Sequence, residues 1–237
     1  MVDINCDMGE GVGNEAQLMP YIDSANIACG YHAGDAATMR EVILLCLQYN
    51  VHVGAHPSFL DRENFGRTPM YLPDSEVYDL VTAQLRIIDH IARDCGSQLY
   101  HVKPHGALYN MAASNASTAK TLAQAVRDFD PSLLYVGLSG SVMIAEAEKL
   151  GLNTASEVFA DRTYQPDGSL TPRSQPDALL VDKEKVTEQV LKMVKEGKVR
   201  TTSGEEVSIK ADTICIHGDG EHAVEFAKAI HNLLHAK

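Results

Sequence analysis

The sequence predicts a TIM-like (β/α)7 barrel that forms a single domain over residues 1–237, and three observations support this fold class. Short apolar runs typical of buried strands alternate along the chain with longer segments whose apolar residues recur at helical spacing. This alternation implies parallel strands joined by right-handed crossovers, and seven such units in a chain of this length usually close into a barrel. No linker, low-complexity segment or run of like charges divides the chain. An open doubly wound sheet is the alternative that the spacing leaves open.

The first half of the chain supplies three of the strands and three helices. Asp35 is placed to cap a helix that runs to about residue 49, with apolar side chains on one face. A long polar connection over 59–73 precedes the next helix, and connections of this length are usually functional or mobile. Strands are expected at 2–6, 25–29 and 51–55, and helices at 14–22, 36–49 and from about 74 to 91.

The second half continues the alternation with four more strands. A second long connection over 159–182 follows the sixth strand, and a β-hairpin around Ser203 and Gly204 precedes the seventh. Ser139 or Ser141 is expected to cap the helix that ends near residue 149. Strands are expected at 99–102, 133–137, 152–158 and 213–216, and helices at 116–129, 142–149, 183–196 and 221–234.

Composition narrows the classes of partner. The net charge of −12 without any basic run argues against nucleic acid and against an anionic membrane surface. The longest purely apolar run, 42–47, is too short to span a bilayer, and the first residues lack a signal-peptide pattern, so we expect a cytoplasmic protein. The five cysteines are scattered without a C-x-x-C pair, which is typical of reduced thiols.

The stretch K-P-H-G-A-L-Y-N, over 103–110, places an ammonium and an imidazole at the end of the fourth strand. Pro104 fixes the backbone between Lys103 and His105, and Gly106 permits a sharp turn or a close approach to a ligand. A solvated lysine and a capping histidine at an ordinary strand end would give the same pattern. The recurrence of polar clusters at other strand ends favours a functional site.

Ionisable side chains follow six of the seven expected strands. Because the carboxyl ends of barrel strands meet on one rim, and active sites of such barrels lie there, we expect these groups to converge. Asp35 is expected to act as a helix cap rather than as a catalyst. The side chains concerned are Asp7, His32 with Asp35, His56, Lys103 with His105, Glu157 with Asp161, and His217 with Asp219.

Several other polar residues are expected to be structural. The arginines of the two long connections are each expected to be solvated surface charges, and Tyr109 is expected to pack beneath the rim rather than stack on a ligand. The arginines are Arg62, Arg67, Arg162 and Arg173, and the histidines expected to be scaffold are His52, His90, His101, His222, His231 and His235.

The pattern permits a metal ion but does not require one. Asp7, His32 and His56 could form an Asp-His-His set suited to zinc or a similar divalent ion, although no local motif such as H-E-x-x-H occurs. The phosphate-binding loop G-x-x-x-x-G-K-[ST] and the dinucleotide fingerprint G-x-G-x-x-G are also missing from the sequence. Any ATP would therefore be bound in some other way or by another chain.

Taken together, the longer motifs identify the chain as similar to the LamB/YcsF family. They are N-C-D-M-G-E at 5–10, N-I-A-C-G-Y-H-A-G-D at 26–35, G-A-H-P-S at 54–58, V-K-P-H-G-A-L-Y-N at 102–110, E-V-F-A-D-R-x-Y at 157–164 and C-I-H-G-D at 215–219. The resemblance implies a barrel like that of the sugar and peptidoglycan deacetylases. It also implies a role in a bacterial ATP-dependent 5-oxoprolinase, which uses ATP as cosubstrate to convert 5-oxo-L-proline to L-glutamate and contains two further subunits.

Ring opening of a lactam suggests roles for the rim residues. The hypothesis assigns Asp7 or His56 as the base for water, His105 as the proton donor to the leaving nitrogen, and Lys103 with Arg173 as the cations that hold anionic groups. His32, Glu157, Asp161 and His217 are further candidates for contact with substrate or phosphate.

Two functions from other classes compete with this one. One is a metal-dependent amidase of the deacetylase type that acts alone on N-acyl sugars. The other is a non-catalytic subunit that binds the lactam while its partners do the chemistry. The sequence leaves homo-oligomerisation open.

Overall fold

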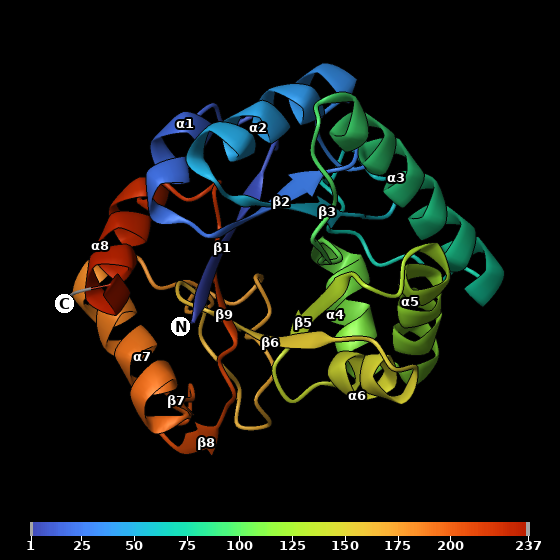
Figure 1. The fold of residues 1–237 in the computed structure, drawn as a ribbon. Helices are drawn as coiled ribbons and strands as arrows, with labels where there is room; N and C mark the ends of the chain where they lie inside the picture. The colour runs from blue at the N-terminus through green and yellow to red at the C-terminus, as the bar shows by residue number, and fades with distance from the viewer. Residues whose placement is uncertain (1, 236–237) are drawn as a thin grey trace.

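The computed structural model describes residues 2–235, in which seven parallel strands close into a barrel (Figure 1). Strand β1 pairs with β2 on one side and with β9 on the other, and this pairing completes the ring. The expected TIM-like (β/α)7 barrel is therefore confirmed, and the open doubly wound sheet is excluded. The barrel strands are β1 (Asp3–Met8), β2 (Ser24–Ala28), β3 (His52–His56), β4 (His101–Val102), β5 (Leu134–Leu138), β6 (Thr154–Phe159) and β9 (Thr213–Ile216).

Helices surround the strands, as Figure 1 shows, with α7 beside α8 on one flank and α3 beside α5 on the other. Each long helix turns an apolar stripe towards the strands, and in α3 this stripe includes Val81, Leu85 and Ile88, which are fully buried. The helices are α1 (Glu15–Leu18), α2 (Ala36–Tyr49), α3 (Asp74–Asp94), α4 (Gly106–Ser114), α5 (Ala116–Phe129), α6 (Val142–Lys149), α7 (Lys183–Glu196) and α8 (Ala223–His235), with the 3₁₀ turn η1 (Met19–Tyr21) after α1.

Three predicted local features are confirmed. Asp35 caps α2, because its carboxylate accepts a hydrogen bond from the Thr38 amide at 2.9 Å. The hairpin between α7 and β9 is formed by β7 (Lys198–Arg200) and β8 (Glu206–Ser208), which pair antiparallel. Of the two serines proposed as caps of α6, Ser141 takes that role, whereas the Ser139 hydroxyl accepts a hydrogen bond from the Lys210 amide.

Helix α4 was not predicted, and the fourth strand is shorter than expected. The helix starts directly after His105 without a capping side chain, so its start lacks the usual signal. Asn115 then ends α4 and caps α5 through Thr118, which leaves a single residue between two helices. Within the described residues 2–235, no helix is long and apolar enough to cross a membrane.

Candidate active site

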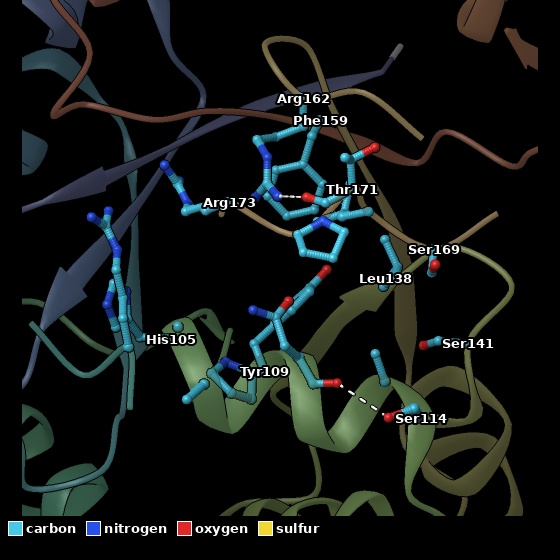
Figure 2. Close-up of a pocket in the computed structure, with 18 of the residues that line it drawn as sticks. His105, Tyr109, Ser114, Leu138, Ser141, Phe159, Arg162, Ser169, Thr171 and Arg173 are labelled. Carbon is cyan, nitrogen blue, oxygen red and sulfur yellow. Dashed lines mark hydrogen bonds between the residues drawn. The ribbon is translucent and has the colours of Figure 1, made fainter. Parts of the chain in front are cut away.

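The carboxyl end of the barrel contains a pocket of about 820 Å³, bounded by strand ends, by α4 and by both long connections. Figure 2 shows Tyr109 and Ser114 on α4 at one wall, and Phe159, Arg162, Thr171 and Arg173 opposite them. The pocket brings together six of the predicted site residues, whereas Glu157, Asp161 and His32 lie behind its lining. The six are Asp7, His56, Lys103, His105, Arg173 and His217.

Lys103 joins two buried carboxylates at the floor of the pocket. Its ammonium donates to Asp7 Oδ1 at 2.9 Å and lies 2.8 Å from Glu157 Oε1, and it also contacts Cys215 Sγ at 3.0 Å. Burial alone would lower the pKa of this ammonium, but Asp7, Cys215 and Glu157 raise the pKa well above its ordinary value. Because its three N–H groups already have partners, the geometry favours a positioning role for Lys103 over direct binding of a ligand anion.

Asp7 is held as a carboxylate at the lining of the pocket. Oδ1 accepts hydrogen bonds from Asn26 Nδ2 at 2.8 Å and from Lys103, and His56 Nε2 lies 3.5 Å from the same oxygen. Burial would raise the pKa of Asp7, but Lys103 and His56 hold it well below the usual range. These three contacts all fall on Oδ1, and Asp7 lines the pocket.

A network of polar side chains in the interior of the barrel holds Asp7 and Lys103 in position. Asn26 donates to Asp7 and to Asn5 Oδ1, and its own Oδ1 accepts a 2.7 Å hydrogen bond from His101 Nε2. His101 was expected to be scaffold, and it fills the interior at the point where β3 carries Gly54. A Cβ at Gly54 would overlap the imidazole, so glycine is required there.

Glu157 is fully buried between Lys103 and Tyr109. The Tyr109 hydroxyl donates to Glu157 Oε2 at 2.6 Å, and this contact raises the pKa of Tyr109, which burial already raises. Tyr109 is buried beneath the rim, as expected, and it also lines the pocket. Its placement depends on α4, the helix that the sequence did not predict.

Glu10 and three histidines form a compact group at the pocket wall. Glu10 Oε1 lies 3.1 Å from His32 Nε2 and 3.4 Å from His105 Nδ1, and His56 Nε2 lies 2.9 Å from His105 Nδ1. The His32 and His105 rings stack with centroids 3.8 Å apart and an interplanar angle of 6°. We call these four residues the Glu10–histidine cluster.

The electrostatics of the Glu10–histidine cluster are set by burial. Removal from water and the nearby Asp7 carboxylate raise the pKa of Glu10 to about 7. Burial and the neighbouring His56 lower the pKa of His32 to about 3 and that of His105 well below its ordinary value. Sequence reasoning missed Glu10, although its position three residues after Asp7 on the same strand end was an available signal.

Hydrogen bonds to carbonyl oxygens fix the orientation of two of these imidazoles. His56 Nδ1 donates to the Lys103 carbonyl at 2.7 Å, and His105 Nε2 donates to the Phe65 carbonyl at 2.9 Å. Phe65 adopts a left-handed conformation with φ of 57°, which is uncommon for a residue with a side chain. The first long connection therefore has a structural role in the site, because its backbone fixes the tautomer of His105.

His217 and Asp161 form a pair beside the pocket, where His217 lies close to Asp7 and Cys215. His217 Nδ1 lies 2.9 Å from Asp161 Oδ1, and the imidazole stacks on Phe159 with centroids 5.4 Å apart. Burial would raise the pKa of the Asp161 carboxyl, but the contact with His217 lowers it below the ordinary value. Asp161 thus orients His217, which itself lines the pocket.

The four arginines of the long connections differ in their exposure and in the groups that they contact. The prediction of a solvated charge is wrong for Arg162, which is buried and donates to the carbonyl oxygens of Thr171 and Ala178. Arg62 donates to two backbone carbonyls of the second strand-to-helix turn, and Arg67 pairs with Asp219 at 2.7 Å. Arg173 is exposed and lines the pocket.

Among the described residues, two groups contain side chains of the types that bind metal ions. One is the Glu10–histidine cluster, and the other is formed by Asp7, Cys215 and His217. In the second group the Lys103 ammonium already contacts both Asp7 and Cys215. The expected set of Asp7, His32 and His56 does not converge on one point. His56 Nε2 lies 3.5 Å from Asp7 Oδ1, but Asp7 and His32 fall in different groups, since His32 Nε2 contacts Glu10 while Asp7 contacts Lys103.

Comparisons with known proteins give full-length matches. A protein from Shouchella clausii that is named as a 5-oxoprolinase subunit is 52% identical over 234 residues, which cover 97% of this chain and 92% of that protein. The crystal structure of the lactam utilization protein from Thermus thermophilus is 41% identical, has a TM-score of 0.93, and matches 99% of this chain and 96% of its own. A family 4 carbohydrate esterase from Streptomyces lividans shares only the fold, with 11% identity, a TM-score of 0.53, and coverage of 99% of this chain and 88% of its own.

The family resemblance inferred from the sequence motifs is confirmed over the whole barrel. The family model described as LamB/YcsF matches residues 2–237, which include every strand end that borders the pocket. On this match and on the identity of its relatives, the chain belongs to the LamB/YcsF family.

Proposed function

We propose that this chain is a catalytic subunit of an ATP-dependent 5-oxoprolinase. The reaction converts 5-oxo-L-proline, ATP and water to L-glutamate, ADP and phosphate, and two further subunits complete the assembly. The observation that carries the proposal is the full-length identity of about one half to proteins named as 5-oxoprolinase subunits. The pocket supports it, because it offers groups for proton transfer beside a space large enough for a small lactam.

The chemistry explains why the reaction needs ATP. The lactam is a resonance-stabilised amide in a five-membered ring, and ring closure of glutamate is favourable. ATP would phosphorylate the amide oxygen and release ADP, water would add to the activated ring carbon, and the carbon–nitrogen bond would break to leave an acyl phosphate. A second water would then hydrolyse this acyl phosphate to glutamate and phosphate. These steps require a base for water, a proton for the leaving nitrogen and cationic groups for the phosphate and the carboxylate.

Asp7 is the stronger of the two candidates for the group that receives the proton of water. It lines the pocket, and Lys103 and Asn26 fix its carboxylate through Oδ1, which leaves Oδ2 as the oxygen proposed to accept the proton. The inward nitrogen of His56 is already engaged by neighbouring side chains, since it lies 2.9 Å from His105 Nδ1 and 3.5 Å from Asp7 Oδ1. We therefore assign Asp7 to orient the water and accept its proton.

His105 is the proposed proton donor to the ring nitrogen. The outer nitrogens of His56 and His105 are fixed as donors to carbonyl oxygens, so an additional proton can sit only between their inward nitrogens, 2.9 Å apart. Glu10 lies 3.4 Å from the His105 side of this pair and stabilises the resulting positive charge. Delivery of that proton to the leaving nitrogen completes ring opening.

Arg173 is the proposed cation for the substrate carboxylate or the phosphate. It is an exposed arginine on the pocket lining, whereas Arg162 is held by carbonyl oxygens and Arg67 by Asp219. Guanidinium groups bind such anions through two parallel N–H donors. Lys103 contributes by fixing Asp7, and not by binding the ligand anion.

The experiment that tests the proposal measures glutamate release from 5-oxoproline, with and without ATP, by this chain alone and in a mixture with its partner subunits. We expect ATP-dependent glutamate only in the mixture. Absence of glutamate from the complete mixture would refute the proposal.

A second candidate is a metal-dependent amidase of the deacetylase type. The Glu10–histidine cluster favours it, because carboxylate and imidazole side chains at a barrel mouth can hold a catalytic ion. Release of acetate from an N-acyl sugar by this chain alone, without ATP, would support this function over the first.

A further inference from the structure

We propose that Glu10, His56 and His105 form a binding site for one divalent metal ion of the zinc class. This set replaces the Asp7, His32 and His56 set that the sequence suggested. The proposal concerns ion binding by this chain alone, so it does not depend on the oxoprolinase reaction. A carboxylate with two imidazoles is a donor set typical of catalytic zinc sites.

The distances between the three donor atoms suit a single ion. His56 Nε2 is 2.9 Å from His105 Nδ1, and Glu10 Oε1 is 3.4 Å from His105 Nδ1 and 3.9 Å from His56 Nε2. Nitrogen and oxygen ligands of tetrahedral zinc lie about 2.0–2.2 Å from the ion, which places the ligands about 3.3–3.6 Å from one another. Of the observed separations, one lies within this range, one is shorter and one is longer by a few tenths of an ångström, so small side-chain movements suffice.

The hydrogen bonds around the two imidazoles are those that metal-ligating histidines make. The outer nitrogen of each ring donates to a backbone carbonyl, that of Lys103 for His56 and that of Phe65 for His105. Each inward nitrogen therefore presents a lone pair when the ring is neutral, and these lone pairs face each other beside Glu10. An ion would relieve the repulsion between the two lone pairs. In the ion-free site, the proton proposed to lie between His56 Nε2 and His105 Nδ1 has the same effect.

The site is open to the pocket on one side. Glu10, His56 and His105 all line the pocket, so a ligand oxygen can reach the fourth position of an ion held there. An ion in such a position supplies Lewis-acid polarisation of a carbonyl oxygen or of water. If the ion is bound, His105 no longer carries the transferable proton, and Asp7 remains as the proton-transfer group.

His32 supports the site without being one of its ligands. Its ring is nearly parallel to that of His105 at 3.8 Å, and in-plane lone pairs of two stacked rings cannot point at the same ion. His32 Nε2 instead lies 3.1 Å from Glu10 Oε1, where it can orient the carboxylate. His32 also lies behind the pocket lining.

The test is the affinity of the untagged full-length chain for Zn²⁺ and Co²⁺, measured after dialysis against a chelator. We expect one equivalent of ion for each chain, and a visible Co²⁺ spectrum typical of tetrahedral nitrogen and oxygen ligands. Glu10→Gln and His105→Gln should each weaken binding more than about 100-fold, whereas His32→Asn should weaken it about 10-fold, as expected for a supporting residue.

A matched control removes two histidines elsewhere. His231 and His235 stack on one another at i and i+4 of α8, a spacing that can hold an ion without a built site. The double variant His231→Gln, His235→Gln should bind the ion with wild-type affinity. Loss of binding in this control, or unchanged affinity in both site variants, would overturn the proposal.

A measurement on the wild type alone keeps the inference falsifiable if the site variants fail to fold. An ion bound to the folded state should raise the unfolding temperature as its concentration exceeds the dissociation constant. A wild-type chain that binds no ion and shows no such rise would overturn the proposal and leave His105 as the proton donor. Glutamate formation by that ion-free chain with its partners would still support the proposed function.

Discussion

The Lys103 ammonium lies 2.8 Å from Glu157 Oε1, and both side chains are inside the barrel, with 3% and 0% of their surface exposed. Lys103 directly follows β4 and Glu157 lies in β6, and β5 separates these two strands in the barrel. Asp7, at the end of β1, is the third member of this charged group. Closure of the barrel therefore determines the arrangement of the pocket floor.

Replacement of Lys103 by methionine should destabilise the fold, because it leaves two buried carboxylates without their counter-ion. We expect the free energy of unfolding in urea to fall by about 3–5 kcal/mol. The double variant Lys103→Met, Glu157→Gln should recover part of this loss, since one buried charge is removed with its partner. Lys149→Met, which removes an exposed lysine paired with Glu146, serves as the control and should have a much smaller effect. Equal effects of Lys103→Met and Lys149→Met would contradict this account of the pocket floor.

Gly106→Ala should damage the site through the backbone. Gly106 has φ of 54°, and a Cβ there would collide with the Gly66 carbonyl of the first long connection. Displacement of that connection would move the Phe65 carbonyl away from His105, and we expect a loss of about 100-fold in turnover by the assembled enzyme.

The matched control for this change is Gly96→Ala. Gly96 also has a positive φ, of 77°, but a Cβ there meets no atom within 4 Å among the described residues. It should cost stability of about 1 kcal/mol and leave turnover nearly unchanged. Equal losses of turnover in the two variants would show that left-handed strain, and not the contact between the two glycines, is responsible.

Stability should depend on pH through Asp161. The pKa of its carboxyl is lower in the folded protein than in the unfolded chain, because the contact with His217 outweighs burial. Ionised Asp161 therefore contributes stability at pH values above the unfolded pKa of about 4, and this contribution is lost as the pH falls through the folded value. The difference in unfolding free energy between wild type and Asp161→Asn should shrink when urea unfolding is repeated at pH 6, 4 and 3. A difference that stays constant across this range would contradict the assignment.

The barrel could be predicted from the sequence because its signals are local and repeated. Each strand is a short apolar run that ends in a polar cluster, and each long helix carries an apolar stripe or a cap such as Asp35. The predicted rim histidines and carboxylates were found for the same reason, since each lies in the last part of a strand or just after it. Local signals were too weak to predict α4, because this helix has no capping side chain at its start.

Pairwise contacts within the site could not be predicted in this way. Nothing near Lys103 in the sequence indicates that Asp7 and Glu157 occupy its N–H groups, because these contacts join residues 96 and 54 positions apart. The burial of Arg162 depends likewise on carbonyl oxygens of Thr171 and Ala178, which a folded connection brings to it. Glu10 was missed because a glutamate between two glycines resembles an ordinary turn residue.

The most direct test of the central claim is the turnover of the Asp7→Asn variant at saturating 5-oxoproline and ATP in the assembled complex. We expect turnover to fall by about 10²–10⁴-fold, since asparagine cannot accept the proton of water. The control is Asp94→Asn, at the exposed end of α3, which should retain wild-type turnover. Unchanged turnover of Asp7→Asn, with only a higher KM for 5-oxoproline, would contradict the claim and identify the chain as a carrier of the lactam.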